Sequence, residues 1–292
     1  MITYHAAGKL MLFGEYLVLN GSKAVAFPLK FGQELIIEDS DKFFWESFNS
    51  SARWFFVSAD TDLNIIETNN RPAAELLLKL MKVIKEQQPS TQVNKHFKII
   101  ANFDLSWGLG SSSTLISLLS QWSSVNAEIL LKSSFGGSGY DVACATANHP
   151  LIFKEGKVLE YIELNPAITD CLLFIYLGKK QSSREEIIRF KKENSTQNQV
   201  DEMNAIIDDA LSSSDIETFE KQILRSETLI SSIIHVETLK SKFFADYPHE
   251  IKSLGAWGGD FFMATFRNLN QAKQYFISKG YSIQFTYKEL IK

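Results

Sequence analysis

Apolar residues recur along the chain at two spacings, and each spacing predicts one kind of element. Over residues 32–68, apolar and polar positions alternate between short polar turns, which predicts a β-rich meander. Over 71–85, apolar residues recur every three or four positions behind Pro72, which predicts an amphipathic helix. The two patterns together predict an α+β protein.

The rest of the chain continues this mixture of elements. Asn165-Pro166 is a plausible boundary, so we expect two domains over 1–165 and 166–292. His235 lies near the end of a long predicted helix and is interpreted as its cap, not as a catalyst. The further predicted elements are a strand, a tight turn and a strand over 1–31, a helix over 126–132, a hairpin over 151–164, strands over 171–177 and 282–287, and helices over 203–211, 216–234 and 271–279.

One glycine- and serine-rich stretch stands between a predicted strand and a predicted helix. It reads Ser106-Trp107-Gly108-Leu109-Gly110-Ser111-Ser112-Ser113-Thr114. The first turn of a helix has backbone N–H groups without partners and a partial positive charge, so a loop that enters a helix in this way favours a phosphate. A well-capped helix after a glycine turn is the alternative that this stretch alone leaves open.

Two other features carry candidate chemistry. The stretch from Ser133 to Ala143 has three glycines ahead of Asp141, which is either the N-cap of a helix or a group that holds the proton of an attacking hydroxyl. Lys9 lies among apolar residues, where an ammonium must reach solvent or meet an anion.

Composition and charge exclude several classes of protein. The chain has 292 residues, 45% of them hydrophobic and 22% charged, which is typical of a globular protein. A net charge of −4 with no basic stripe argues against nucleic-acid binding. There is no leader pattern and no apolar run of about 20 residues, so we expect a cytoplasmic protein without a membrane partner.

The cysteine and histidine positions point to no metal or disulfide framework. Cys144 and Cys171 each have apolar neighbours, which predicts buried free thiols. The five histidines show no paired spacing, so we predict no zinc site.

Three glycine-containing stretches together resemble a known family. They are Gly8-Lys9 with Gly14-Glu15-Tyr16, then Gly108 to Ser113, then Gly255-Ala256-Trp257-Gly258-Gly259. In this order they resemble the three motifs of the GHMP kinases, which include galactokinase, homoserine kinase, mevalonate kinase and phosphomevalonate kinase. The resemblance extends over nearly the whole chain. Within the family, the stretches from Gly137 to Val142 and from Gly258 to Asp260 look more like phosphomevalonate kinase.

The resemblance implies a fold and an activity. The fold would be the two-domain GHMP kinase fold, with an N-terminal ATP-binding domain like domain 2 of ribosomal protein S5, a ferredoxin-like α/β sandwich at the C-terminus, and the nucleotide between them. The activity would be ATP- and Mg²⁺-dependent phosphoryl transfer to a small-molecule acceptor. Phosphomevalonate, in the mevalonate pathway of isoprenoid biosynthesis, is the first candidate, and mevalonate or another acceptor is the alternative.

The resemblance also implies roles for particular residues. Lys9 would neutralise charge on the transferred phosphoryl group, Asp141 would orient or deprotonate the acceptor, and Ser112 would be a ligand of Mg²⁺. The implied nucleotide contacts are Gly108, Leu109, Gly110, Ser111, Ser112 and Ser113. The implied acceptor contacts are Lys9, Glu15, Tyr16, Ser138, Gly139, Asp141, Ser182, Ser183, Gly258 and Gly259.

The chain departs from the family pattern at several positions. Ala7 replaces a proline, and Trp107 and Trp257 stand where the family has small residues, so these tryptophans either narrow the nucleotide cleft or pack as core. The segment between Ser112 and Asp141 is short, and it lacks the helix that carries a glutamate ligand of Mg²⁺ in many relatives. Glu128 is a poorly spaced substitute, so Mg²⁺ would be held mainly by Ser112 and the phosphates.

Two rival functions come from other classes. A dinucleotide-dependent oxidoreductase would use Gly108-Leu109-Gly110 and an acid such as Glu128, but Ser113 replaces the third glycine and Glu128 falls within a helical run. A non-catalytic sensor could use the same fold, although the retention of Lys9 and Asp141 argues against it. The expected partner is a small-molecule acceptor, and a monomer and a homodimer both remain open.

Overall fold

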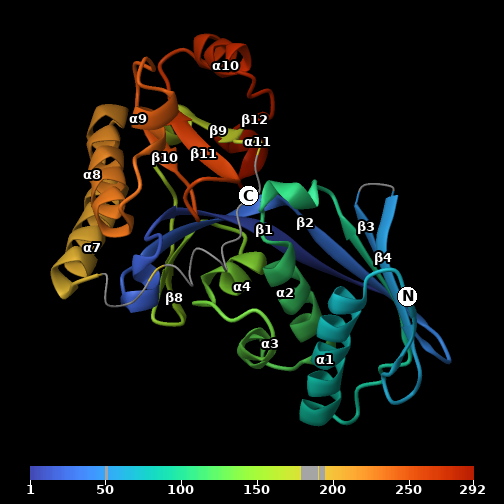
Figure 1. The fold of residues 1–292 in the computed structure, drawn as a ribbon. Coiled ribbons are helices and arrows are strands. Elements are labelled where there is room, and N and C mark those ends of the chain that lie inside the picture. The colour runs from blue at the N-terminus through green and yellow to red at the C-terminus, as the bar shows by residue number, and fades with distance from the viewer. Residues whose placement is uncertain (50–51, 179–189, 191–194) are drawn as a thin grey trace. The chain divides into compact units, whose positions relative to one another are not determined.

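The computed structural model describes residues 1–49, 52–178, 190 and 195–292, and these form two compact units (Figure 1). Unit 1 consists of Met1–Gly8, Phe31–Leu105 and Leu109–Thr146, and unit 2 consists of Lys9–Lys30, Ser106–Gly108 and Ala147–Lys292. Strands and helices are mixed in both units, which confirms the predicted α+β class. The predicted domain limits at residues 165 and 166 stay a prediction.

Unit 1 is built on a sheet with the strand order β5-β4-β3-β6-β2, in which β1 also pairs with β2. β3 and β6 are parallel, whereas β2–β6, β3–β4 and β4–β5 are antiparallel. The β-rich stretch predicted over 32–68 is confirmed, and β3, β4 and β5 form the predicted meander, but β6 lies between β2 and β3. The strands are β1 (Ile2–Phe13), β2 (Ala24–Asp39), β3 (Phe43–Asn49), β4 (Ala52–Ala59), β5 (Ile65–Thr68) and β6 (Lys95–Ala101), of which β1 and β2 continue into unit 2.

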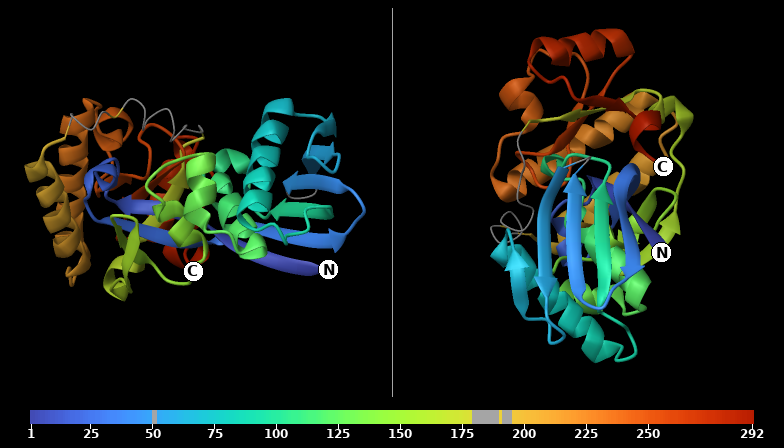
Figure 2. Two further views of the ribbon diagram at one scale, coloured as in Figure 1. Left: turned by 90° about the horizontal axis from the view of Figure 1, so that it is seen from below. Right: turned by 90° about the vertical axis from the view of Figure 1, so that its right-hand side faces the viewer.

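Helices cover one face of this sheet (Figures 1 and 2). They are α1 (Arg71–Gln87), α2 (Ser111–Ser123), α3 (Ala127–Ser133) and α4 (Tyr140–Ala145), with the short 3₁₀ turn η2 (Leu105–Trp107) ahead of α2. Leu77 and Met81 of α1 and Leu119 of α2 join one apolar core with Leu35 and Phe97 of the sheet. The apolar face predicted for the helix over 71–85 is the face that packs on the sheet.

Unit 2 contains an antiparallel four-stranded sheet in the order β10-β11-β9-β12. These strands are β9 (Leu172–Tyr176), β10 (Ile251–Ser253), β11 (Phe261–Thr265) and β12 (Gln284–Thr286). Phe244, Tyr247, Phe262 and Phe276 form an aromatic core on it. The remaining elements are η1 (Leu17–Asn20), the hairpin β7 (Leu151–Lys154) and β8 (Lys157–Tyr161), and helices α5 (Pro166–Thr169), α7 (Gln197–Leu211), α8 (Ile216–Ile234), α9 (Leu239–Phe243), α10 (Leu269–Ser278) and α11 (Tyr287–Leu290).

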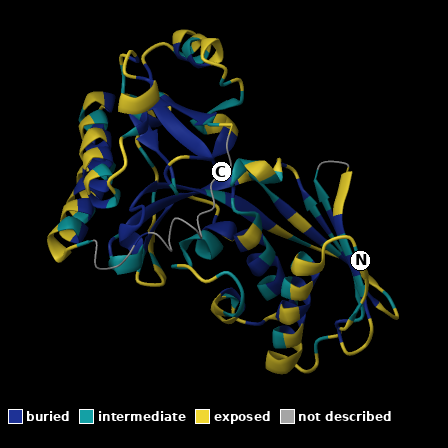
Figure 3. Ribbon diagram, viewed as in Figure 1, coloured by how far each residue is buried: buried dark blue, intermediate teal, exposed yellow. Residues whose placement is uncertain are grey.

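Capping explains two of the differences between the predicted and the observed limits of elements. The helix predicted from residue 203 begins at Gln197, because Thr196 and Gln199 form a capping box. The strand predicted over 282–287 stops at Thr286, because Thr286 and Glu289 form a second capping box that starts α11. Helix α8 has its predicted limits, and its buried residues form a stripe along one side (Figure 3). His235 is the C-cap of this helix, as predicted, and its backbone is left-handed.

The two cysteines are free and differ in burial. Cys144 is buried as predicted, whereas Cys171 is half-buried. Among the described residues, the structure contains no helix with the length and apolar content needed to cross a bilayer.

Candidate functional site

The N-terminus of α2 presents backbone donors without a capping side chain. Gly110 occupies the N-cap position in a left-handed conformation, with φ of 95°, and no side chain among the described residues caps this end. The first intrahelical bond is donated by Thr114 N to Gly110 O at 3.0 Å. The N–H groups of Ser111, Ser112 and Ser113 precede that bond and point out of the helix end, where they and the helix dipole favour an anion.

The four consecutive hydroxyls of this helix start divide into two pairs. Ser113 is buried and its Oγ donates to Gly110 O at 2.8 Å, and the buried Thr114 donates its hydroxyl to Gln33. Ser111 is half-buried and Ser112 is exposed. The first pair therefore fixes the turn, and the second pair remains available to a ligand.

Ser111 and Ser112 lie at the edge of a cavity of about 170 Å³ within unit 1. No charged side chain of the described residues lines it, and most of its wall is apolar or aromatic. Its lining residues are Gln33, Trp45, Ser47, Trp54, Phe55, Ala73, Leu76, Leu77, Ile99, Ser111, Ser112, Leu115 and Phe135. Such a cavity suits a flat, largely apolar group whose anionic end reaches the start of α2.

The helix that carries Asp141 packs against α2 within unit 1. Gly139, with φ of 91°, is the N-cap of α4, and Asp141 is the second residue of the helix. The interpretation of Asp141 as an N-cap is therefore wrong. Its Oδ1 accepts a hydrogen bond from the N–H of Val142 at 3.1 Å, and Ser138 and Gly139 precede it in the same half-buried turn.

Of the predicted site residues not yet placed, Leu109 lies in unit 1, whereas Lys9, Gly108, Gly258 and Gly259 lie in unit 2. Lys9 is a half-buried residue of β1, Gly258 is exposed with φ of 97°, and Gly259 is buried. A common site for Lys9 and Asp141 stays a prediction. The predicted Ser182 and Ser183 lie outside the described residues.

Tyr16 links the first glycine motif to the third within unit 2. It has φ of 60°, and its hydroxyl accepts a hydrogen bond from the backbone N–H of Trp257 at 3.2 Å. Trp257 itself is only 5% exposed, which fits its interpretation as core. The ring of Trp107 packs near Phe285 and Phe261, at centroid distances of 5.6 and 6.2 Å.

Glu15, predicted to contact the acceptor, is almost fully buried. Its side chain is 1% exposed, and its carboxylate accepts a hydrogen bond from Lys252, which also contacts Glu227. Sequence reasoning did not select Lys252 or Glu227. No local signal marks Lys252, because Glu250 and Ser253 give it polar neighbours in the sequence.

The side chains that the structure describes provide few ligands for a metal. Among the described residues, no group of three or more His, Cys, Asp or Glu could hold a metal ion. Glu128, the substitute considered above, has a side chain that is 64% exposed and pairs with Lys132 at 2.6 Å, and this partner lowers its pKa. Ser112 thus remains the candidate protein ligand for Mg²⁺. A single protein ligand is reasonable, because bound Mg²⁺ usually retains several waters and takes phosphate oxygens as further ligands.

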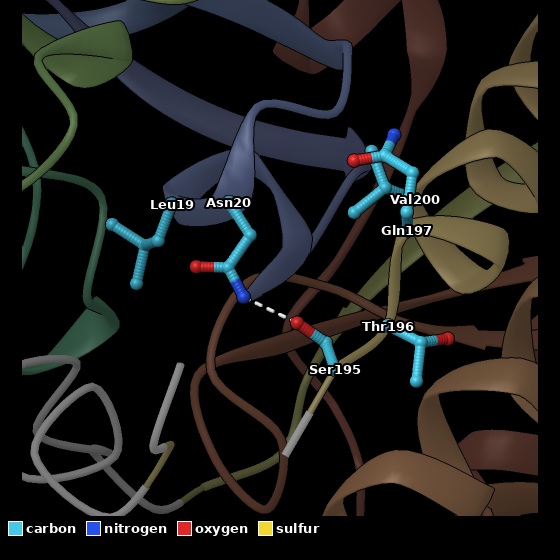
Figure 4. Close-up of a pocket in the computed structure, with 6 residues that line it drawn as sticks. All are labelled: Leu19, Asn20, Ser195, Thr196, Gln197 and Val200. Atoms are coloured by element: carbon cyan, nitrogen blue, oxygen red, sulfur yellow. Dashed lines mark hydrogen bonds between the residues drawn. The ribbon is translucent and has the colours of Figure 1, made fainter. Parts of the chain in front are cut away.

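A second cavity, of about 390 Å³, lies in unit 2 beside the start of α7 (Figure 4). Asn20 Nδ2 donates to Ser195 Oγ at its edge. The other lining residues are Leu19, Thr196, Gln197 and Val200. None of the predicted site residues that the structure describes lines this cavity.

Comparison with known proteins identifies the fold. A scan against models of known families found no match, and a search of curated proteins found none. Streptococcus pneumoniae phosphomevalonate kinase, solved with phosphomevalonate and AMPPNP, superposes with a TM-score of 0.75 at 18% identity over 98% of this chain and 100% of that chain. Methanococcus jannaschii mevalonate kinase superposes with a TM-score of 0.68 at 19% identity, over 97% of this chain and 96% of that chain.

A sugar kinase shares the same architecture. Lactococcus lactis galactokinase, solved with galactose, gives a TM-score of 0.72 at 11% identity, covering 97% and 92% of the chains. The chain therefore has the GHMP kinase fold, as its three glycine motifs predicted. At these identities the likeness is one of fold.

Proposed function

We propose that the protein is an ATP-dependent kinase that phosphorylates a small molecule. One observation carries the proposal: in a chain with the GHMP kinase fold, the uncapped N-terminus of α2 opens at an uncharged aromatic cavity. The first feature suits a phosphate chain and the second suits a purine ring. The two occur side by side in unit 1.

In this proposal the nucleotide spans the helix start and the cavity. Its base occupies the space between Trp54 and Leu76, and its phosphates accept hydrogen bonds from the first N–H groups of α2. The hydroxyl of Ser112 would be the protein ligand for Mg²⁺, which when bound would neutralise charge on the phosphates.

The chemical step is an in-line transfer. An oxygen of the acceptor forms a bond to the γ-phosphorus, the bond from that phosphorus to the bridging oxygen breaks, and ADP leaves with the electron pair. Asp141 holds the acceptor oxygen in line and takes its proton if the acceptor is an alcohol. Lys9 neutralises the charge that builds on the transferred group. An acceptor phosphate that is already ionised needs no base, so positioning dominates.

Phosphomevalonate is the acceptor that we place first. Support comes from the stretches that end at Val142 and Asp260, which look like those of phosphomevalonate kinase, and from the likeness to the S. pneumoniae enzyme. Mevalonate is the second candidate, and a nucleotide or metabolite sensor without catalysis is the candidate from another class.

The test is ADP release by the purified full chain with Mg-ATP and, separately, phosphomevalonate, mevalonate, homoserine and galactose. We expect stoichiometric ADP with one acceptor, phosphomevalonate first, and a background rate with the others. Binding of ATP without ADP release for any acceptor would support the sensor. The Asp141→Asn variant controls for a contaminating kinase. If this protein releases the ADP, the variant must release it more slowly, whereas a contaminant would be unaffected by the substitution.

A further inference from the structure

Three charged side chains are buried together in unit 2, away from any solvent. The exposed fractions of the side chains are 0% for Lys252, 1% for Glu15 and 4% for Glu227. Glu15 lies in the turn after β1, Glu227 in the middle of α8, and Lys252 in β10. We call these three residues the buried charge cluster.

The contacts of the buried charge cluster use every donor of the lysine. Lys252 Nζ donates to Glu15 Oε1, to Glu227 Oε1 at 3.2 Å and to Ser253 O at 3.0 Å. Glu227 also accepts from Ser253, through the backbone N–H at 3.1 Å and the hydroxyl at 2.9 Å. The ring of Phe13 lies 5.5 Å from the ammonium. Among the described residues, Glu15 Oε2 has no hydrogen-bond partner although it is buried.

The charges in this cluster do not balance if all three groups are ionised. One ammonium faces two carboxylates, and an uncompensated buried charge is costly, so a proton on one carboxyl gives the neutral arrangement. Burial, aided by the negative charge of Glu15 and opposed by the attraction of Lys252, raises the pKa of Glu227 to about 7. Burial also raises the pKa of Glu15, again against the attraction of Lys252.

Lys252 remains the charged partner. Burial alone would favour its neutral form, but attraction from Glu15 and Glu227 outweighs burial and raises its pKa. The charged groups that face Glu227 are Lys252 of β10 and Glu15 of the turn after β1. Helices α7 and α5 also pack on α8. In α7, Asp209 pairs with Arg225 at 2.8 Å, and α5 contains no charged residue.

The buried charge cluster joins the two loops of unit 2 that carry predicted acceptor contacts. Glu15 stands between Gly14 and Tyr16, and Lys252 leads through Ser253 into the glycine stretch 254–260. The hydrogen bond between Tyr16 and Trp257 is a second link between the same loops. The carboxylate of Glu15 is turned into the cluster, from where it can act on a ligand through its loop.

We propose that Lys252, Glu15 and Glu227 share one proton between the two carboxyls and are positioning residues that hold the turn 14–16 against the glycine stretch 254–260. When the proton leaves, two carboxylates face one ammonium, and the link between the loops loosens. The consequence for acceptor binding rests on the proposed function. The shared proton and the loosening do not.

The first test detects the proton in the purified full chain by infrared difference spectroscopy between about pH 6 and about pH 8.5. We expect a protonated-carboxyl band that disappears at the higher pH. Glu227→Gln and Glu15→Gln should each abolish it, because one carboxylate then balances one ammonium. Glu217→Gln, on the exposed side of the same helix, is the matched control and should retain it. Absence of the band from the unmodified protein would overturn the proposal.

The second test measures the link without an activity assay. Amide hydrogen exchange in 14–18 and 254–260, corrected for intrinsic pH dependence, should lose about tenfold in protection between about pH 6 and about pH 8.5. The loss should be absent in Glu227→Gln or Glu15→Gln, whichever folds better. Unchanged protection in the unmodified protein would overturn the positioning role. If kinase turnover is found, the KM for the acceptor should rise over the same range with kcat nearly constant, whereas absence of turnover contradicts only the proposed function.

Discussion

The carboxylate of Asp260 lies directly against the α-carbon of Gly108. A Cβ placed on Gly108 would come within 2.1 Å of the carboxyl carbon and 2.2 Å of each carboxylate oxygen of Asp260. Gly108 has φ of 71°, and Asp260 is 7% exposed. A glycine is thus favoured at position 108 for two reasons. Its backbone is left-handed, and Asp260, which directly follows the third glycine motif, leaves no room for a Cβ.

Substitution of Gly108 should therefore destabilise the protein more than its backbone conformation explains. Gly136 has φ of 67°, close to that of Gly108, and a Cβ there would meet nothing within 4 Å. Gly136→Ala should cost about 1 kcal/mol of unfolding free energy for the left-handed conformation. Gly108→Ala should cost about 2 kcal/mol more, because the methyl group overlaps the carboxylate. Urea unfolding of both variants measures the difference, and equal costs would show that the close approach is unimportant.

The two pairs of hydroxyls at the start of α2 should respond differently to removal. Ser112→Ala should weaken Mg-ATP binding about tenfold, the effect of one charge-assisted contact, and leave unfolding free energy within about 0.5 kcal/mol. Ser113→Ala, which removes the hydrogen bond to Gly110, should cost about 1 kcal/mol of stability and affect binding less. Calorimetric titration and thermal unfolding of the two variants give both quantities. The same response from both serines would contradict the assignment.

Filling the aromatic cavity should exclude the nucleotide base. Leu76 lines the cavity, whereas Lys79, less than one turn further along α1, is exposed and does not line it. Leu76→Trp should weaken ATP binding by at least about tenfold, and Lys79→Trp should leave it unchanged. Affinity for ATP and for free triphosphate, measured on both variants, separates the base from the phosphates. If Leu76→Trp binds ATP normally, the base lies elsewhere.

The two residues assigned to the chemical step should be separable from nucleotide binding. Lys9→Ala and Asp141→Asn should each keep their affinity for ATP and lose at least about tenfold in turnover, since each acts mainly on charge or proton position in the transition state. Turnover and ATP affinity of each variant are the readouts. Near-normal turnover in both would remove these residues from the active site.

Local signals were sufficient for the elements that the sequence predicted well. Helix α8 keeps its predicted limits because both ends are set by neighbours in the chain: Asp215 accepts from Thr218 N at 2.8 Å, and His235 ends the helix with φ of 56°. The same holds for the α2 start, where Gly110 and the serines define the turn. Misplaced limits, as at Gln197, arose where a capping box was not recognised.

Contacts between distant segments were not predictable in the same way. Trp45 and Ser47 reach the cavity through β3, whose parallel pairing with β6 cannot be deduced from either strand alone. Glu15 and Lys252 are 237 positions apart, so nothing in either local sequence shows that they pair. The structure shows the carboxylate of Glu15 in a buried ion pair with Lys252, and the ligand contact that the resemblance implies for Glu15 stays a prediction.

The most direct test of phosphoryl transfer is ³¹P NMR of the full chain with Mg-ATP and each candidate acceptor. The account predicts that the γ-phosphate signal of ATP disappears while ADP and one phosphorylated acceptor appear in equal amounts, with phosphomevalonate as the first candidate. ATP that stays intact with every acceptor, or that yields only ADP and inorganic phosphate, would contradict it.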